Sequence, residues 1–311
     1  MRVLLALGGN AMAGPDGSTD PKHQMEAAQT ASTHVATLVR QGHDLVLTHG
    51  NGPQVGNLLV KEELAAAVLS PVPLDWCGAM TQGSIGFILL NALDAAFTAA
   101  GVRRPPAVVV TRTLVDVEDT AFAHPTKPVG RFLPETDAQV MVAHGQIWED
   151  RGKQGWRRVV PSPEPVEVID GPAIKAMLDA GFTVIANGGG GIPVVRDEAG
   201  QLRGVEAVID KDLGAVVLAS QVVADALVIA TDVENAMIGW GTPDPRPIGT
   251  VTAAELRALA ADGHFPTGSM GPKVDAVCRF VENGGRLAVI TSVARIADAL
   301  EGSAGTLVIP D

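Results

Sequence analysis

The chain has 311 residues, of which 46% are hydrophobic and 19% charged, and its formal net charge is −12. This acidic balance excludes nucleic acid and anionic membrane surfaces as expected partners, because both bind basic faces. Two cysteines are too few for a disulfide framework, and no apolar stretch approaches about 20 residues, so we expect a cytoplasmic protein with no membrane partner.

The N-terminal part alternates short apolar runs with helical segments. Val3 to Leu7 and Asp44 to Thr48 are predicted strands, which lead into the loops Gly8-Gly9-Asn10 and Gly50-Asn51-Gly52. The predicted helices span 21–40, about 54–67, and a stretch that opens with a turn near 75 and reaches about 100. The order strand, loop, helix, repeated, is typical of parallel strands with right-handed crossovers.

Small residues mark the last of these helices. They permit close packing against a neighbouring helix or a second subunit: Gly78, Ala79, Gly83, Ser84 and Gly86. A further strand is predicted over 107–111. The pattern then changes, and from about 116 to 165 it is polar and proline-rich, with a hairpin predicted between Trp148 and Trp156. We expect an inserted lid subdomain that covers a site.

A run of four glycines, Gly188 to Gly191, follows the predicted strand 182–186. Glycine lets backbone N–H groups approach a ligand closely and accepts positive φ. A flexible linker is the alternative, but linkers are usually polar on both sides, whereas this run lies between apolar segments. Together with the two earlier glycine loops, it predicts one ligand cleft at the carboxyl edge of a parallel sheet.

The remaining elements continue the α/β pattern. A hairpin is predicted over 193–204, and a boundary between two lobes, 1–220 and 221–311, is placed at the turn near 220. Helices are predicted over 171–180, from near 210, over 252–261 with a Thr252–Glu255 capping box, and after GSMGPK; strands are predicted over 226–230, 287–291 and 307–309.

Two lysines, Lys211 and Lys273, lie at predicted helix starts. A lysine there opposes the helix dipole, so its position is better explained by a bound anion. For Lys211, which lies between Asp210 and Asp212, a capped and salt-bridged turn is the alternative. GSMGPK is not a Walker P-loop, the glycine loops do not fit GxGxxG, and no Cys/His cluster indicates a metal site, while His49 is interpreted as a core or surface residue.

These features favour phosphoryl transfer, in which a protein mainly positions two anions and neutralises the charge on the moving group. Lys211 and Lys273 would straddle that group, and Asp210 would hold both lysines in register. The loops would supply N–H groups or close approach at Gly8, Gly9, Asn10, Gly52 and Gly189.

The chain resembles the carbamate kinase family of the amino-acid kinase superfamily. The resemblance runs in order through LALGGNA, THGNGPQVGN, DWCGAMTQGSIGF, TKPVG, RRVVPSPEP, VIANGGGGIPVV, GVEAVIDKDL, LVIATDVENA and GSMGPKVDAVCRFVE. It implies a three-layer α/β/α sandwich with a mainly parallel, roughly eight-stranded sheet and an inserted lid, usually as a homodimer. It also implies reversible phosphoryl transfer between carbamoyl phosphate and ADP, giving ATP and carbamate, with Mg²⁺ accompanying the nucleotide.

Site residues follow from the same resemblance. The implied catalytic set is Lys211, Lys273, Asp210 and Lys127, the last in the lid. The implied substrate-binding set, in the lobe 1–220, is Gly8, Gly9, Asn10, Gly50, Asn51, Gly52, Gly188 and Gly189. The implied nucleotide-binding set, associated with the lobe 221–311, is Lys211, Thr231, Asp232, Met237, Met270 and Lys273. The chain departs from the family at Ala236-Met237, where an aromatic residue is common, and Met237 is expected to fill that space.

Two other functions stay open at this point. One is a kinase of the same superfamily that acts on another small acid, against which the lid motifs argue. The other is a non-catalytic sensor of a phosphorylated metabolite, against which the joint presence of Asp210, Lys211 and Lys273 argues.

Overall fold

A central sheet of eight strands organises the protein, whose computed structural model describes residues 1–9, 12, 18–265 and 270–311. The strand order is β15 (Thr250–Thr252), β17 (Thr306–Ile309), β16 (Leu287–Ser292), β12 (Ala226–Thr231), β1 (Arg2–Leu7), β2 (Asp44–His49), β9 (Thr183–Ile185) and β3 (Pro106–Val108). Neighbouring strands run parallel except β16 and β17. The predicted mainly parallel, eight-stranded sheet is confirmed.

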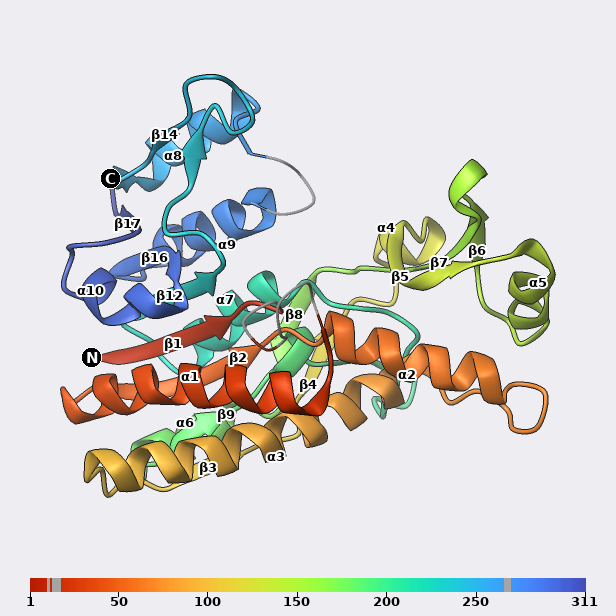
Figure 1. Cartoon of the computed structure of the whole chain (residues 1–311), viewed down its shortest axis with the longest axis horizontal. Coiled ribbons are helices and arrows are strands. Elements are labelled where there is room, and N and C mark those ends of the chain that lie inside the picture. Colours follow the sequence, from red (N-terminus) through yellow and green to blue (C-terminus); the bar gives the residue numbers. More distant parts are fainter. Residues whose placement is uncertain (10–11, 13–17, 266–269) are drawn as a thin grey trace.

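Helices cover both faces of this sheet, which gives the predicted three layers (Figure 1). Along β1, Leu4 and Ala6 enter one core while Val3, Leu5 and Leu7 enter the other, because successive side chains of a strand point to opposite faces. One face is covered by α1 (Pro21–Arg40), α3 (Leu74–Ala100) and α10 (Ile296–Leu300). The other is covered by α6 (Gly171–Asp179), α7 (Lys211–Gln221), α8 (Ala253–Ala261) and α9 (Met270–Glu282).

The two halves of the chain occupy two halves of one sheet. Strands that precede residue 220 lie on one side of the junction between β1 and β12, and strands that follow it lie on the other. At the junction Val3 pairs with Ala226 and Leu7 with Ala230. The halves are therefore joined by a continuous backbone ladder.

The predicted lid is a separate small subdomain that extends away from the central sheet (Figure 1). It consists of the antiparallel sheet β5 (Lys127–Leu133), β7 (Trp156–Val160) and β6 (Trp148–Asp150), together with α4 (Thr120–Ala123), α5 (Glu135–Ala143) and η3 (Gly152–Gln154). Leu133, Met141 and Trp148 belong to its own apolar cluster. The hairpin between Trp148 and Trp156 is confirmed.

Smaller elements connect the lid and the C-terminal half to the central sheet. A second sheet has four strands, and two of them border the lid in the sequence: β4 precedes the lid and β8 follows it. Its strands are β11 (Leu202–Gly204), β10 (Ile192–Arg196), β4 (Arg112–Val115) and β8 (Pro165–Val168). The other elements are α2 (Gly52–Ala65), η4 (Gly188–Gly190), η5 (Val293–Arg295) and the hairpin β13 (Met237–Ile238) and β14 (Arg246–Pro247). The predicted hairpin β10–β11 and the Thr252–Glu255 capping box are confirmed.

Two boundaries near α3 differ from the prediction. The helix already begins at Leu74, with no turn before its glycines. Packing explains Gly86, because a Cβ there would lie 2.6 Å from Val108 Cγ2, whereas a Cβ on Gly78 or Gly83 would meet no described atom within 4 Å. The strand predicted over 107–111 ends at Val108. Beyond it the Thr111 N–H donates to Gln82 Oε1 at 2.7 Å, which takes this residue out of the ladder.

Helix α3 is also long and apolar enough to cross a membrane, by length and composition only. The sequence analysis expected no such segment. One face of α3, including Leu89 and Phe97, is buried in the core that it shares with α1, and a single helix of this kind is weak evidence for a membrane span. We therefore interpret α3 as a core helix with an exposed outer face.

Candidate active site

Glycine loops meet at the carboxyl edge of the central sheet. The Gly8 N–H donates to the Ala230 carbonyl at 2.8 Å, and the Gly50 N–H donates to the Leu7 carbonyl at 2.9 Å. A Cβ on Gly50 would lie 2.7 Å from the backbone nitrogen of Gly9 and 3.3 Å from Lys211 Cδ. Glycine at position 50 therefore lets the first two loops touch and lets the Lys211 side chain pass beside them.

The glycine run Gly188–Gly191 forms a tight, mostly buried turn. Its last three residues have φ of +68°, +88° and +94°, a region that glycine enters without strain. A Cβ on Gly188 would lie 2.4 Å from the His49 ring, and one on Gly190 would lie 2.9 Å from the Ile209 carbonyl oxygen. The flexible-linker alternative is therefore wrong. Close packing against the protein itself explains the choice of glycine at these two positions.

His49 lies beneath the loops and is 2% exposed. Burial lowers the pKa of its imidazole to about 4, although a hydrogen bond to the Gly50 carbonyl opposes the shift. The ring Nδ1 lies 3.1 Å from that carbonyl oxygen, to which it donates. His49 is thus a neutral core residue that supports Gly50 and Gly188, in agreement with its interpretation from the sequence.

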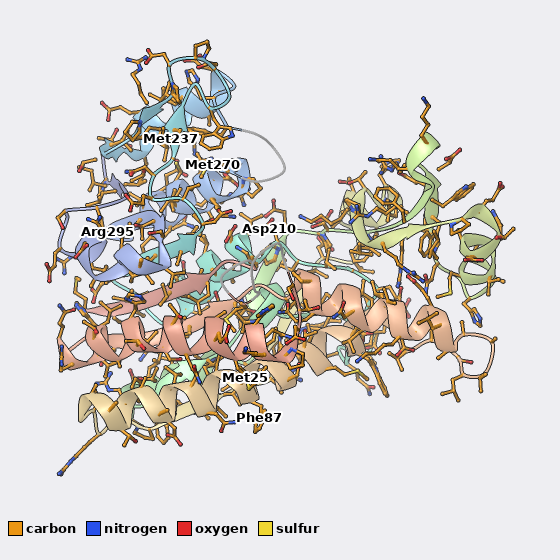
Figure 2. The ribbon with its side chains drawn as sticks, in the orientation of Figure 1. Met25, Phe87, Asp210, Met237, Met270 and Arg295 are labelled. Carbon is orange, nitrogen blue, oxygen red and sulfur yellow. The ribbon has the colours of Figure 1, made fainter. Side chains whose placement is uncertain are left out.

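A cavity of about 610 Å³ opens beside the loops, between the start of α7 and the lid. Most of the predicted substrate and catalytic residues line it: Gly9, Gly50, Asn51, Gly52, Lys127, Gly189, Asp210, Lys211 and Lys273. In the described ranges, Gly8 and Gly188 lie behind this wall rather than on it. Asn10 lies outside the described residues. Figure 2 shows Asp210 near the junction of the central sheet and the lid.

Asp212 holds the two predicted catalytic lysines. Lys211 Nζ lies 2.5 Å from Asp212 Oδ1, and Lys273 Nζ lies 3.2 Å from Asp212 Oδ2. Burial alone would raise the pKa of the Asp212 carboxyl, but the charges of both lysines outweigh it and hold that pKa below its ordinary value. Burial, reinforced by Lys273, lowers the pKa of the Lys211 ammonium despite its attraction to Asp212. One carboxylate therefore serves two lysines.

Asp210 makes different contacts from those that the sequence analysis assigned to it. Its Oδ1 accepts the N–H groups of Asp212 at 2.9 Å and Leu213 at 3.4 Å, so it caps α7. Its Oδ2 lies 3.8 Å from Lys127 Nζ. The contacts to Lys211 Nζ and Lys273 Nζ belong to Asp212 instead. The triplet Asp210-Lys211-Asp212 was the available signal, but the sequence does not show which carboxylate faces Lys273, since that depends on how α7 packs against α9.

A second, smaller cavity of about 180 Å³ lies in the C-terminal half. Four of the predicted nucleotide-binding residues line it: Thr231, Asp232, Met237 and Met270. Figure 2 shows Met237 and Met270 in this half of the molecule, away from the lid. Trp240, which was not among the residues expected from the sequence, also lines this cavity and is 63% exposed. Its signal was an aromatic residue shortly after Met237 in a chain without tyrosine.

Known proteins resemble this chain over most of its length. The chain matches the amino acid kinase family over residues 1–292. It is 47% identical to a carbamate kinase from Thermococcus kodakarensis, over 99% of each chain, and 45% identical to carbamate kinase 1 from Enterococcus faecium, over 94% of this chain and 93% of that one. The solved structure of carbamate kinase from Giardia lamblia bound to AMP-PNP is similar at a TM-score of 0.94 and 42% identity, covering 100% of this chain and 98% of that chain.

The match to relatives thus extends over nearly the full length of this chain, and it includes the lid as well as the sheet. The resemblance to the carbamate kinase family is confirmed. The chain belongs to the amino acid kinase family and, within it, to the carbamate kinases.

Proposed function

We propose that this chain is an active carbamate kinase, which reversibly transfers a phosphoryl group between carbamoyl phosphate and ADP to give ATP and carbamate. Carbamate then decomposes to ammonia and CO₂. The observation that carries the proposal is the placement of Lys211 and Lys273 on one carboxylate, Asp212, beside the glycine loops. Close relatives named carbamate kinase support the choice of substrate.

Local charge makes phosphate binding possible in an acidic protein. The net charge of −12 repels anions at long range. In the cavity, however, two lysines share one carboxylate, which leaves an excess positive charge, and both lysines belong to the first turns of α7 and α9. Helix N-termini favour anions. The cavity is therefore a local anion site.

The transfer needs no covalent protein intermediate. A β-phosphate oxygen of ADP forms a bond to the phosphorus of carbamoyl phosphate, while the bond from that phosphorus to the carbamoyl oxygen breaks and its electron pair leaves with carbamate. Lys211 and Lys273 neutralise charge on the oxygens of the moving group, and Asp212 positions both ammonium groups. The backbone of the glycine loops fixes the position of the phosphoryl group.

We assign the nucleotide base to the smaller cavity, between Met237 and Met270 with Trp240 beside them. Thioethers and an aromatic ring provide a polarisable surface for a base. On this assignment the nucleotide contacts residues 221–311 through Thr231 and Asp232, and carbamoyl phosphate contacts the N-terminal lobe 1–220.

We expect Mg²⁺ to enter with the phosphates of ATP or ADP. Within the described part of the chain, no three His, Cys, Asp or Glu side chains form a group that would hold a metal ion on its own. Magnesium commonly binds substrate phosphates with only one or two protein carboxylates, so such a cluster is not required.

We propose that the functional unit is a cytoplasmic homodimer formed through the outer face of α3. Trp76 and Phe87 on this helix are 59% and 64% exposed, and Met80 lies between them at helical spacing. Figure 2 shows Phe87 on α3 and Met25 on the neighbouring α1. Large exposed apolar side chains gathered on one face favour a protein interface. Light scattering of the purified protein measures the assembly.

The activity is tested by adding carbamoyl phosphate and Mg²⁺-ADP to the purified protein and coupling ATP formation to a reporter enzyme. Lys211→Ala removes a charge next to the transferred group and should lower kcat by about 10²–10³-fold, as the loss of an electrostatic donor does elsewhere. Lys175→Ala is the matched control, because Lys175 pairs with Asp179 at 2.6 Å on the surface of α6. Wild-type ATP formation equal to that of Lys211→Ala would refute the proposal.

The same preparation decides between the alternatives. A panel of acyl phosphates and small acids, run with ADP or ATP, identifies a different acid substrate. Protection of the protein from thermal unfolding by carbamoyl phosphate, without turnover, indicates a sensor. We expect turnover with carbamoyl phosphate, because a sensor has no need for two lysines placed around one transferring group.

A further inference from the structure

Two cationic side chains from the lid line the main cavity, Lys127 on β5 and Arg157 on β7. The lysines of the cavity have carboxylate partners, since Lys127 lies near Asp210, and Lys211 and Lys273 both lie near Asp212. Arg157 differs. Across the described residues it makes no ion pair within 4.0 Å, and its buried Nε has no hydrogen-bond partner.

The guanidinium of Arg157 is nevertheless held in place. Its central carbon lies 4.8 Å from the centroid of the Phe132 ring, a cation–π contact between paired strands. Phe132 is brought opposite Arg157 by an irregularity in β5 between Val129 and Phe132, where Gly130 has φ +66°. The ring restricts the guanidinium and uses none of its N–H donors. Arg157 is therefore oriented without being neutralised.

The next residue of β7, Arg158, has a carboxylate partner, although its Nε, like that of Arg157, has no hydrogen-bond partner among the described residues. Arg158 is 3% exposed, and its guanidinium is paired with Glu206 outside this cavity. Successive residues of a strand point to opposite faces. The Arg157 side chain therefore lines the main cavity, while the Arg158 side chain lies on the other face and pairs with Glu206. The contrast identifies Arg157 as the member of the pair that is available to a ligand.

The position of Arg157 indicates which end of the substrate it meets. Lys273 and Met270 both belong to α9, and Met270 lines the smaller cavity that we assign to the nucleotide. The lid lies on the other side of the start of α7 from this half of the protein (Figure 1). Because nucleotide, phosphorus and leaving oxygen are roughly in line during transfer, the acid end of the substrate points toward the lid.

We propose that Arg157 is a further catalytic residue that binds the carbamoyl group of carbamoyl phosphate and stabilises carbamate as it leaves. This inference rests on the proposed function. When the bond between phosphorus and the carbamoyl oxygen breaks, its electron pair stays on that oxygen, and the product H₂N–CO₂⁻ carries a carboxylate. A planar guanidinium donates to two carboxylate oxygens at once, and this contact strengthens as the negative charge develops.

The test compares three arginine variants in the coupled ATP-formation assay. Arg157→Gln should lower kcat with carbamoyl phosphate about 100-fold, in the range seen for lost charge-stabilising donors, and leave the KM for ADP within twofold. Arg157→Lys keeps the charge but not the fork, so it should recover only part of the rate. Arg151→Gln, in the same hairpin but paired with Glu149 at 2.6 Å, should match the wild type.

The outcomes separate the two proposals. An inactive wild-type protein would refute the carbamate kinase proposal and this inference with it. An active wild type with Arg157→Gln indistinguishable from Arg151→Gln would refute this inference alone. Circular dichroism and thermal unfolding establish that each variant is folded. If Arg157→Gln does not fold, the kcat of Arg157→Lys decides, and a wild-type kcat in that variant would refute the role of the planar guanidinium.

Discussion

The edge of the central sheet and the lid form two walls of one cavity, and they are built in opposite ways. At the sheet edge the glycine loops present backbone to the cavity, fixed by contacts as tight as that of Gly50 with Gly9. On the lid the wall includes side chains, Lys127 and Arg157, carried by a three-stranded sheet with its own small core. The sheet edge is placed by the main core, whereas the lid packs on α2 and α3 through a smaller cluster that includes Val129 and Val160.

The difference separates positioning from charge. Backbone N–H groups in a packed core keep their places when a ligand binds or leaves, so they suit the phosphoryl group, whose position must be fixed. Cationic side chains on a lid supply charge from outside the main core and cover the cavity, which suits a substrate that must be shielded from water. Four measurements test this contrast, from the largest expected effect to the smallest.

The largest effect is expected at the carboxylate on which the two lysines converge. Asp212→Asn leaves Lys211 and Lys273 partly buried without a counter-charge and should lower the free energy of unfolding by about 3–5 kcal/mol, as breaking a buried pair does elsewhere. Urea unfolding measures it. Glu149→Gln, on the exposed partner of Arg151, is the control and should have a much smaller effect. Equal losses of unfolding free energy in the two variants would show that the Asp212 carboxylate behaves as an exposed group.

The second effect is a pH dependence that comes from beneath the glycine loops. The pKa of His49 is about 4 in the folded protein and near its ordinary 6.5 when unfolded, so the unfolded state binds the extra proton between these values. Stability should therefore fall as pH drops from about 6.5 to 4, by about 3 kcal/mol from this residue at 1.36 kcal/mol per pKa unit.

His49→Gln isolates that contribution, because glutamine does not titrate. The difference in unfolding free energy between wild type and variant should shrink as pH falls from 7 to 4, which urea unfolding across this range measures. A difference independent of pH would mean that His49 titrates normally and that the support beneath the loops is open to water.

The third effect separates two neighbouring glycines. Gly50→Ala places a Cβ 2.7 Å from the Gly9 nitrogen and should cost about 1–3 kcal/mol of stability, the usual range for overpacking. Gly52→Ala meets no described atom within 4 Å and should lie within about 0.5 kcal/mol of the wild type. Thermal unfolding compares the two. If both variants match the wild type, the loops at the sheet edge can move apart to accept a Cβ, and the proposed rigidity of that edge is wrong.

The smallest effect is expected in the lid. Arg151 and Glu149 form an ion pair with side chains 42% and 44% exposed. Removing it by Arg151→Gln should change the free energy of unfolding by less than about 1 kcal/mol, because solvent already screens the pair. A loss of several kcal/mol in urea unfolding would show that a substitution in the lid hairpin costs as much stability as one at the sheet edge.

Local patterns were sufficient to predict most of the fold. Helix α1 has the predicted bounds, Pro21–Arg40, because Asp20 caps its start and Gly42, with φ +88°, follows its end. The strands β1 and β12 are buried on both faces and therefore appear as continuous apolar runs. The start of α3 was not predictable in this way, since Gly78 and Gly83 weaken the local helix signal.

The sequence was sufficient to predict which residues line the candidate site, but not which side chains contact one another there. The dipole argument located Lys211 and Lys273, because a charge at a helix start depends on nearby sequence alone. The contact of Asp212 with both lysines depends on how α7 and α9 pack, and the need for glycine at 188 depends on His49, which is distant in sequence. Such pairings are tertiary facts that one sequence does not contain.

The central position of β1 has a consequence for the synthesis of this protein. The Arg2 N–H donates to Asp225 Oδ2 at 2.7 Å across 223 residues, and β12 completes the pairing of β1 on that side. A nascent chain on the ribosome must therefore carry an unpaired, apolar edge of β1 until about three quarters of it has been made. Unpaired strand edges of this kind promote aggregation, and long-range pairing is slow. We therefore expect that a fragment ending near residue 220 aggregates in the cell, and that the full chain folds to completion only after β12 has emerged.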